Sequence, residues 1–571
     1  MSQSHRDNPD NQNPDTSSPL RNLQRTSRRS FLKGFGAATI ASAVPMTALG
    51  VYGGEKHKAR AAIPAVLNGL QRRKQAYQRR VSAASSDKKI SVPFQSGNGD
   101  EANFPGGIAS FTKGLGHNNV GEVQAAGYAS YQHAISTGQS SDFDNIPMGG
   151  NTPLVDPQAG LAFDLEGVDV AQIALPPAPT FSSPDRAAEA VEVYWVALAR
   201  DVPFSQYGNE PITEAAISEL HGLSAYPGPR HSGEVIAQNL FRGFTPGDQV
   251  GPYVSQLLIQ PFNYGPMPIA GYQTDLPLGS GGTDFMTDAG SWLAVQNGQG
   301  PFPAGKPDPT MRFPRSGRDL AAYVHVDVLY QEYLNAALVL TKMGAPLNSG
   351  NPYDNLKSET GFITFGLPHV QVLLAEVMAR ALKHAWYEKW FVNRVLRPEE
   401  FGGRVHFTMT GDRKYPIDST ALNSQALQAT FQRNGTWLLP MTYPEGCPQH
   451  PSYPEGHGSA AGAAVTVLKW FFDESFVIPN PVVATDDGSA LTPYTASDAG
   501  QLTVGGELNK IAANVAIGRI FAGVHWRSDY MQSLLLGEAV AISVLADQQH
   551  LYNESFSGFT FTRFDGTKIT V

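Results

Sequence analysis

The sequence has only one cysteine, Cys447, in 571 residues. Neither an internal disulfide nor a cysteine-based metal cluster can therefore form within one chain, and a bound metal would need histidine and oxygen ligands. Long runs of one charge are also absent, although the net charge is −9. This even distribution favours small or neutral substrates and argues against nucleic acid or an anionic membrane surface as a partner.

The sequence also lacks an internal repeat and a clear linker from about residue 62 onward. Its 57 glycines and 42 prolines are scattered through many loops, and 41% of its residues are hydrophobic, enough to fill a substantial core. A chain of this length can form one very large domain or roughly two to four ordinary ones. We predict one domain over 62–571, preceded by a leader at 1–61.

The leader predicts an export signal. Residues 1–26 are polar and too poor in apolar side chains to offset the entropy of ordering. Arg28 and Arg29 then precede a mild apolar stretch over 34–51, which is typical of a twin-arginine signal, and the small-x-small triplet 59–61 is a candidate cleavage site for it. A membrane anchor is the alternative, but the stretch is short and weakly hydrophobic for a spanning helix. We expect export to the periplasm or the cell exterior and no stable membrane span in the mature chain.

Apolar residues at helical spacing dominate the rest of the chain and predict a mainly α fold with minor β hairpins. Ser183 and Pro184 supply an N-cap and a first-turn proline for one helix. The alternating C-terminal segment, with its Asp-Gly turn, predicts a hairpin over 558–571. The predicted helices cover 185–199, 319–343, 368–396, 456–473, 505–517 and 527–547.

Lys389 and Arg397 form the first of three clusters of cations and histidines, near the end of the predicted helix 368–396. Eight residues turn an ideal helix by about 800°, so the two cations would lie ~80° apart around it and roughly 12 Å apart along it. Their long side chains could converge on one anion. A solvated basic surface is the alternative, because lysine and arginine usually lie at surfaces.

The second cluster runs from His450 to His457 and leads into the predicted helix 456–473. Prolines keep the approach extended, while Gly456 and Gly458 let the backbone come close to a ligand at the helix start. Free backbone N–H groups and the positive helix end favour an oxyanion there. The two histidines suit anion binding and proton transfer. A capped helix with surface histidines is the alternative.

Arg519, His525 and Asp529 form the third cluster. Six residues on a straight helix would place Arg519 and His525 about 120° apart, so their convergence requires a break, which Gly523 supplies. If a helix resumes after His525, the Asp529 carboxylate can accept the imidazole N–H and leave the other ring nitrogen free to ligate or attack. Ordinary packing is the alternative for a lone His-Trp pair.

Together the clusters read Lys-x7-Arg-Pro, His-Pro-Ser-Tyr-Pro-x-Gly-His and Arg-x5-His-x3-Asp. This order resembles the signature shared by vanadium haloperoxidases and type-2 phosphatidic acid phosphatases. The spacer after the lysine, and stretches such as 239–243, 251–256 and 332–336, resemble the bromoperoxidases of red algae and related bacterial enzymes. The resemblance spans roughly 65–571 and places the active-site motifs within 386–529.

The resemblance implies a large helical haloperoxidase domain built around a four-helix bundle, a vanadate cofactor and a homo-oligomer. It also implies that hydrogen peroxide oxidises bromide or iodide to hypohalous acid, with small organic molecules as acceptors. By motif position, His525 is the vanadium ligand, His450 assists proton transfer, and Trp386 and His450 mark the halide pocket. The residues implied to bind the vanadate oxygens are Lys389, Arg397, Gly456, His457 and Arg519.

Glu455 departs from the family pattern, which usually has a serine here that donates to a vanadate oxygen. An ionised carboxylate would repel vanadate and offset one positive charge of the site. Three outcomes stay open: a protonated Glu455 that donates, a Glu455 paired with an arginine, or a loss of vanadate affinity. The alternatives to a haloperoxidase are an acid phosphatase that uses His525 as its nucleophile and a non-catalytic relative.

Overall fold

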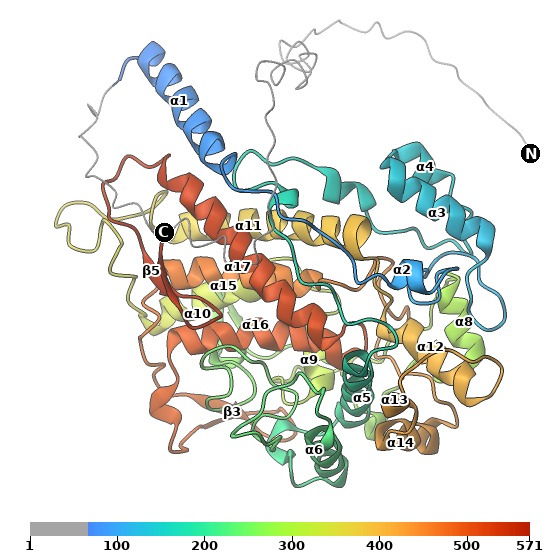
Figure 1. The fold of residues 1–571 in the computed structure, drawn as a ribbon. Coiled ribbons are helices and arrows are strands. Elements are labelled where there is room, and N and C mark those ends of the chain that lie inside the picture. The colour runs from blue at the N-terminus through green and yellow to red at the C-terminus, as the bar shows by residue number, and fades with distance from the viewer. Residues whose placement is uncertain (1–66) are drawn as a thin grey trace, which may run out of the picture. The chain divides into compact units, whose positions relative to one another are not determined.

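The computed structural model describes residues 67–571. The predicted leader and twin-arginine signal at 1–61 lie outside the described residues. Within the described part, helices account for most of the regular structure and the strands form only short hairpins (Figure 1). The predicted mainly α fold with minor β hairpins is confirmed.

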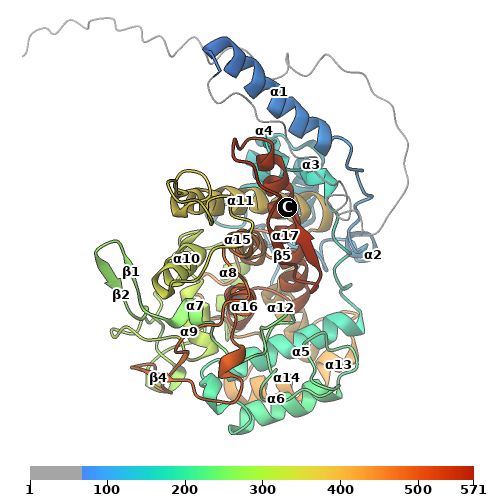
Figure 2. The ribbon, with the colours of Figure 1, turned by 90° about the vertical axis from the view of Figure 1, so that its left-hand side faces the viewer.

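Four long helices form the centre of the fold (Figures 1 and 2). α15 (Gly456–Phe471) packs against α11 (Leu367–Tyr387), α16 (Val504–Phe521) and α17 (Arg527–Gln549). Every residue of α15 except His457 is buried. A helix surrounded by others in this way has no solvent face to supply with polar side chains, which explains its content of alanine, glycine and valine.

Glycines let α15 and α17 approach closely. A Cβ at Gly462 would lie 2.2 Å from the carbonyl oxygen of Leu534, and a Cβ at Gly537 would lie 2.0 Å from the carbonyl oxygen of Ser459. Because backbone atoms would have to move to admit a side chain, only glycine fits at these positions. The contact fixes the starts of the two helices relative to each other, and both starts carry predicted site residues.

A second layer of helices lies beside this bundle (Figure 2). The Ser183 hydroxyl accepts a hydrogen bond from the Arg186 N–H at 3.1 Å, and Pro184 occupies the first turn, so the predicted helix start is confirmed. The layer contains α5 (Pro184–Ala199), α6 (Pro211–Gly222), α13 (Ser419–Leu422) and α14 (Gln425–Asn434).

The other elements of the described chain are short or peripheral, apart from those that carry site residues. The remaining α-helices are α1 (Gly69–Asp87), α2 (Asp100–Asn103), α3 (Ala125–Thr137), α4 (Ser140–Asp144), α7 (Gln256–Ile259), α8 (Ala289–Gln296), α9 (Gly317–Tyr323), α10 (Gln331–Met343) and α12 (Pro398–Met409). Short helical turns occur at η4 (Pro157–Leu161), η5 (Val170–Gln172), η6 (Phe204–Gln206), η7 (Leu278–Ser280), η8 (Glu388–Asn393) and η9 (Ala499–Gln501).

The strands pair only with their neighbours in sequence. Each of the three sheets is one antiparallel hairpin, and the last confirms the hairpin predicted over 558–571, with Gly566 at φ +82° in its turn. The hairpins are β1 (Phe262–Tyr264) with β2 (Met267–Ile269), β3 (Val482–Ala484) with β4 (Leu491–Pro493), and β5 (Thr560–Thr562) with β6 (Lys568–Thr570).

The prediction of one helix over 319–343 is wrong. The chain leaves the helical conformation after α9 and resumes only at α10. Tertiary contacts hold the intervening segment: Arg519 Nη1 donates to the Val324 carbonyl at 2.7 Å, and Asp327 contacts His457. The helical periodicity comes from two separate helices, and Asp327 in the break between them contacts the predicted site residue His457.

The predicted helix 368–396 is wrong in its last part. α11 ends at Tyr387 and continues as the π-helical turn η8, after which Arg394 adopts a φ of +47°. This backbone conformation ends the helix, and an ion pair with Glu101 at 2.5 Å holds the Arg394 side chain.

We also expect from the sequence that Pro398 stops this helix, but Pro398 instead opens the next one, α12, with Arg397 as its N-cap residue. The Glu400 carboxylate accepts the Arg397 N–H at 2.9 Å. Lys389 and Arg397 therefore lie on different elements, so the separation predicted for a single helix does not apply.

The predicted helices 456–473, 505–517 and 527–547 correspond to α15, α16 and α17. Among the described helices, α17 alone has the length and composition of a membrane span, but 78% of the qualifying window is buried inside the protein. That burial is typical of a core helix.

Candidate active site

Residues of the second and third predicted clusters line one cavity of about 260 Å³. Lys389 and Arg397 of the first cluster are not in its lining but hydrogen-bond to the other two clusters. The cavity lies where the end of α11, the start of α15, the end of α16 and the break between α9 and α10 come together. Its lining residues are Asp327, Leu329, Glu332, Tyr333, Leu382, Trp386, Pro448, His450, Gly456, His457, Ala460, Val515, Arg519 and His525.

His525 lies in the break between α16 and α17. Gly523, at φ +84°, turns the chain there, which a residue with a side chain would resist. His525 Nδ1 lies 2.8 Å from Asp529 Oδ2, so the predicted contact between these residues is confirmed. Asp529 also accepts from the Trp526 N–H at 3.0 Å and from the Ser452 hydroxyl. With Nδ1–H donated to Asp529, Nε2 keeps its lone pair and can ligate a metal.

The charge state of His525 suits that role. Burial, reinforced by the nearby Arg397 and Lys389 charges, holds the pKa of His525 well below its ordinary value. The imidazole is therefore neutral at neutral pH, as a metal ligand must be. In this structure Arg397 Nη1 lies 2.9 Å from Nε2 and occupies its acceptor side.

Lys389 and Arg397 connect the clusters to each other. Lys389 Nζ donates to the carbonyl oxygens of Pro451 at 2.8 Å and Ser452 at 2.6 Å. Arg397 donates through Nε to the His450 carbonyl at 2.9 Å and through Nη1 to the Val524 carbonyl at 2.7 Å. Both cations are fully buried, so their charges act in a medium that screens them little.

Arg519 brings a third buried cation to the cavity. Its Nη1 donates to the Val324 carbonyl at 2.7 Å and to the Tyr443 hydroxyl at 3.3 Å. Its Nε is buried and has no hydrogen-bond partner among the described residues. A buried guanidinium N–H without a partner is costly, and an anion in the cavity would satisfy it.

The loop from His450 to His457 places the start of α15 at the cavity, as predicted. Its glycines also serve packing. A Cβ at Gly458 would lie 1.9 Å from Ser533 Oγ on α17, and a Cβ at Gly456 would lie 3.2 Å from the Trp386 ring. Gly458 therefore admits a neighbouring helix, whereas Gly456 lines the cavity, and its contact with a ligand stays a prediction.

His457 lies against Asp327, a residue that the sequence analysis missed. His457 Nε2 is 3.0 Å from Asp327 Oδ2. Burial raises the pKa of the Asp327 carboxyl, but His457 lowers it more, and the result lies below the usual range. Sequence reasoning placed Asp327 inside a continuous helix, where it had no reason to be singled out.

Trp386 and His450 lie together at one end of the cavity. Their ring centroids are 4.6 Å apart, and Lys389 Nζ lies 5.9 Å from the Trp386 ring centroid. Burial, together with the Arg397 charge, lowers the pKa of His450 well below its ordinary value. A neutral imidazole beside two cations can accept a proton that an incoming acid releases.

Comparison with known proteins places this chain in a family. The model of the VCPO second helical-bundle domain matches residues 369–554. A vanadium-dependent bromoperoxidase of Corallina pilulifera is 35% identical over 88% of this chain and 99% of its own length. One from Ascophyllum nodosum is also 35% identical, over 87% of this chain and 92% of its own. This chain belongs to the vanadium-dependent bromoperoxidase family.

A solved family structure has the same fold. The homohexameric second vanadate-dependent bromoperoxidase of Ascophyllum nodosum superposes with a TM-score of 0.83 at 30% identity and covers 95% of both chains. The helical bundle described above is therefore the fold of the bromoperoxidase family.

The cavity of this bromoperoxidase family member fits an oxyanion. Arg519, the N-terminal end of α15 and the neutral His525 line it beside Asp327 and Glu332, and the Arg519 Nε lacks a partner inside the described protein. Of the residues predicted for the site, Trp386, His450, Gly456, His457, Arg519 and His525 line the cavity, whereas Lys389, Arg397 and Glu455 do not. The roles assigned to them by resemblance stay predictions.

Glu455 is the exception to this pattern of donors. Its side chain is fully buried, and neither carboxyl oxygen has a hydrogen-bond partner among the described residues. Of the three open outcomes, an ion pair between Glu455 and an arginine is not found in the part of the chain that the structure describes.

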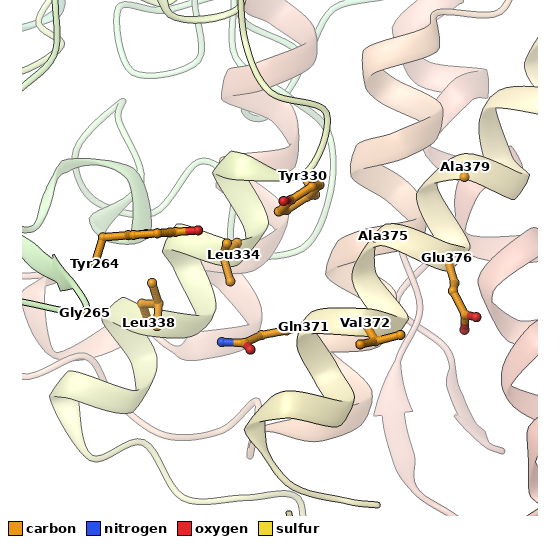
Figure 3. Close-up of a pocket in the computed structure, with 10 residues that line it drawn as sticks. All are labelled: Tyr264, Gly265, Tyr330, Leu334, Leu338, Gln371, Val372, Ala375, Glu376 and Ala379. Carbon is orange, nitrogen blue, oxygen red and sulfur yellow. The ribbon is translucent and has the colours of Figure 1, made fainter. Parts of the chain in front are cut away.

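A larger hollow lies elsewhere, between β1, β2, α10 and α11 (Figure 3). It measures about 750 Å³ and is lined mainly by apolar and aromatic side chains such as Tyr264, Tyr330, Leu334 and Val372. Glu376 is the one charged residue in its lining, so size alone does not make it the candidate active site.

Proposed function

We propose that the protein is a vanadate-dependent haloperoxidase that uses hydrogen peroxide to oxidise bromide or iodide to hypohalous acid. One halide, one peroxide and one proton give one hypohalous acid and one water. The observation that carries the proposal is that two of the motifs line one cavity beside the neutral His525, while the buried Lys389 and Arg397 of the third motif hydrogen-bond to both of them.

Different residues would bind the vanadium atom and the oxygens of the cofactor. His525 Nε2 would ligate vanadium, while Lys389, Arg397, Arg519 and the Gly456 N–H would bind the oxygens. Asp529 keeps His525 in the tautomer with Nε2 free. Bound vanadate supplies Lewis acidity, which makes hydrogen peroxide electrophilic toward a halide without a change in metal oxidation state.

Two histidines, His450 and His457, would transfer protons. His450 is held neutral beside Arg397 and can accept a proton from entering peroxide at a ring nitrogen. His457, paired with Asp327, would hydrogen-bond an oxygen of the bound oxyanion and hold or return a proton there. The halide would bind beside Trp386 and His450, where the Lys389 charge favours an anion.

A phosphatase would use a cavity of the same shape, so the test must measure both activities. Purified protein is assayed with peroxide and each halide, with and without vanadate, and in parallel for phosphate ester hydrolysis. We expect halide oxidation that requires vanadate. Ester hydrolysis without halide oxidation would replace this proposal by the acid phosphatase, and neither activity would indicate a non-catalytic relative.

We further propose that the protein is exported by the twin-arginine route to the periplasm or cell exterior and forms a homo-oligomer there. The Arg28–Arg29 pair supports the first part, and the homohexameric Ascophyllum nodosum relative supports the second. Replacement of both arginines by lysine should retain the protein in the cytoplasm on cell fractionation. Light scattering after size exclusion should give a multiple of the chain mass; a monomer would contradict the second part.

Hypohalous acid leaving the cavity would halogenate small organic acceptors. Val326, Val328 and Leu329, which flank Asp327 at the cavity, are exposed apolar side chains that support this choice. Product analysis with and without an added aromatic acceptor tests it.

A further inference from the structure

Glu455 occupies the position just before α15 but does not cap the helix. Its side chain makes no hydrogen bond to the first turn. It is 0% exposed, and both of its carboxyl oxygens lack a hydrogen-bond partner among the described residues. Buried polar groups almost always have partners, so a carboxyl with none, directly before the cavity-lining Gly456 and His457, indicates a missing ligand.

Charged groups from every neighbouring element act on Glu455. The cations are Arg519 on α16, Lys389 on η8 and Arg397 before α12, and the acidic groups are Asp529 on α17 and Tyr333 on α10. None of the cations forms an ion pair with Glu455 in the described structure, because each donates to backbone carbonyls. An ionised carboxylate would therefore be buried without direct compensation.

The balance of these effects favours the neutral acid. Burial raises the pKa of the Glu455 carboxyl well above its usual range, and Asp529 adds to the rise, while Arg519 and Lys389 only partly oppose it. A bound oxyanion would raise this pKa further, because two anions would then compete for the same cations.

We propose that Glu455 is a neutral carboxylic acid whose O–H donates a hydrogen bond to the bound oxyanion. This inference rests on the proposed function, since the oxyanion is the vanadate of that function. It assigns the site one donor that can be switched off: above a certain pH the acid ionises, loses its O–H and repels the ligand. Oxyanion binding is thereby linked to the protonation of one named residue.

The first test measures oxyanion affinity without peroxide or halide. Sulfate is the probe, because its own charge stays constant over the pH range used, and vanadate is measured beside it. We expect the sulfate affinity of the unmodified protein to fall with rising pH more steeply than that of Glu455→Gln. Glutamine keeps a neutral donor of the same shape but cannot ionise, while all other titrating groups stay the same.

A second variant tests the hydrogen bond itself. Glu455→Ala should bind vanadate roughly 10- to 100-fold more weakly at low pH than the unmodified protein, as expected for one hydrogen bond to a charged group. Glu538→Gln is the matched control, because Glu538 is another buried glutamate but accepts the Phe564 N–H at the C-terminal hairpin. It should leave oxyanion affinity unchanged.

Infrared difference spectroscopy supplies a readout that needs no binding constant. The unmodified protein should show a carboxylic acid C=O band that shifts when sulfate is added and that is missing from Glu455→Gln. Glu538→Gln should keep the sulfate-sensitive band. Glu332→Gln is a second control, because burial also raises the pKa of the Glu332 carboxyl and Glu332 lines the cavity. A sulfate-sensitive band that is lost from Glu332→Gln and kept in Glu455→Gln would overturn the inference.

The outcomes separate the inference from the proposed function. Equal pH dependence in the unmodified protein and Glu455→Gln, or unchanged affinity in Glu455→Ala, would overturn the inference while halide oxidation could still be measured. Sulfate binding with the expected pH dependence but without halide oxidation would overturn the function alone. Failure of every form to bind vanadate would overturn both.

Discussion

Single residues decide what the cavity can do, and Asp529 shows how. It contacts His525, Trp526 and Ser452 through one carboxylate oxygen, so it orients the imidazole and also ties α17 to the loop before α15. Such a partner fixes which nitrogen of a histidine carries the proton. His525, the proposed vanadium ligand, can therefore be disabled without being replaced.

Asp529→Asn should weaken vanadate binding roughly 10- to 100-fold and lower bromide oxidation in parallel, because an amide holds the imidazole N–H less firmly than a carboxylate does. Equilibrium dialysis with vanadate and a bromide oxidation assay measure the two effects. Asp547→Asn is the control, since Asp547 lies on the same helix but accepts the Gly167 N–H far along it. A vanadate affinity within about twofold of the unmodified protein would contradict the prediction.

At the scale of single residues, the buried His384 on α11 makes the free energy of unfolding depend on pH. Burial lowers its pKa to about 4, whereas an unfolded chain gives histidine about 6.5. The unfolded state therefore binds a proton where the folded state does not, and stability falls as the pH drops from about 6.5 toward about 4.

His384→Leu should remove this part of the acid destabilisation. The free energy of unfolding lost between about pH 7 and pH 5 should be smaller in the variant by about 2 kcal/mol, measured by urea titration. The exposed His231 provides the control, and His231→Leu should leave the loss unchanged. An identical loss in His384→Leu would rule out this cause.

At the scale of elements, the site depends on how closely α15 and α17 approach each other. The first turn of α15 supplies the loop end and its N–H groups, and the first turn of α17 supplies Asp529. Gly462 and Gly537 set the distance between the two helices, so a change there acts on the site without touching it.

Gly462→Ala should destabilise the protein by about 1–3 kcal/mol, because the new Cβ would meet the Leu534 carbonyl and two packed helices would have to separate. Thermal unfolding measures the loss. Gly222→Ala is the matched control, since nothing lies within 4 Å of a Cβ at that position in α6. Equal melting temperatures for the two variants would show that the helices can separate freely.

At the scale of the described molecule, the first described helix contacts the segment that follows α17. Arg79 on α1 donates to the carbonyls of His550 at 2.5 Å and Tyr552 at 3.0 Å, just beyond α17. The C-terminal hairpin covers the far end of α15, where the buried Lys469 donates to the Thr562 carbonyl at 2.9 Å. The last residues therefore belong to the core and are not a peripheral tail.

Phe561→Ala should cost about 3–5 kcal/mol of stability, because Phe561 is 0% exposed and its removal leaves a cavity against the bundle. Urea unfolding gives the value. Phe163→Ala, at a side chain that is 80% exposed, should change stability by less than about 0.5 kcal/mol. An unchanged free energy of unfolding in Phe561→Ala would mean that the hairpin contributes little to the stability of the fold.

Local patterns determined much of this molecule. Helical periodicity, the Ser183 cap and the C-terminal turn residues act over a few positions, and the structure agrees with them. The three motifs also act locally in part: Gly523 breaks the helix, and Asp529 reaches His525 four residues away. These features could be predicted because each depends on neighbours in sequence.

Only the tertiary structure decided the rest. Asp327 enters the site because Arg519 and His457 hold the break between α9 and α10, and Arg397 opens a new helix instead of ending an old one. From the sequence alone, Glu455 is a carboxylate that would repel an oxyanion. In the fold it is a buried carboxyl without a partner among the described residues, beside cations that are already engaged. The physical reason is the same in each case. The protonation state and the hydrogen-bond partners of a side chain depend on groups far away in the sequence, and only folding brings these groups into contact.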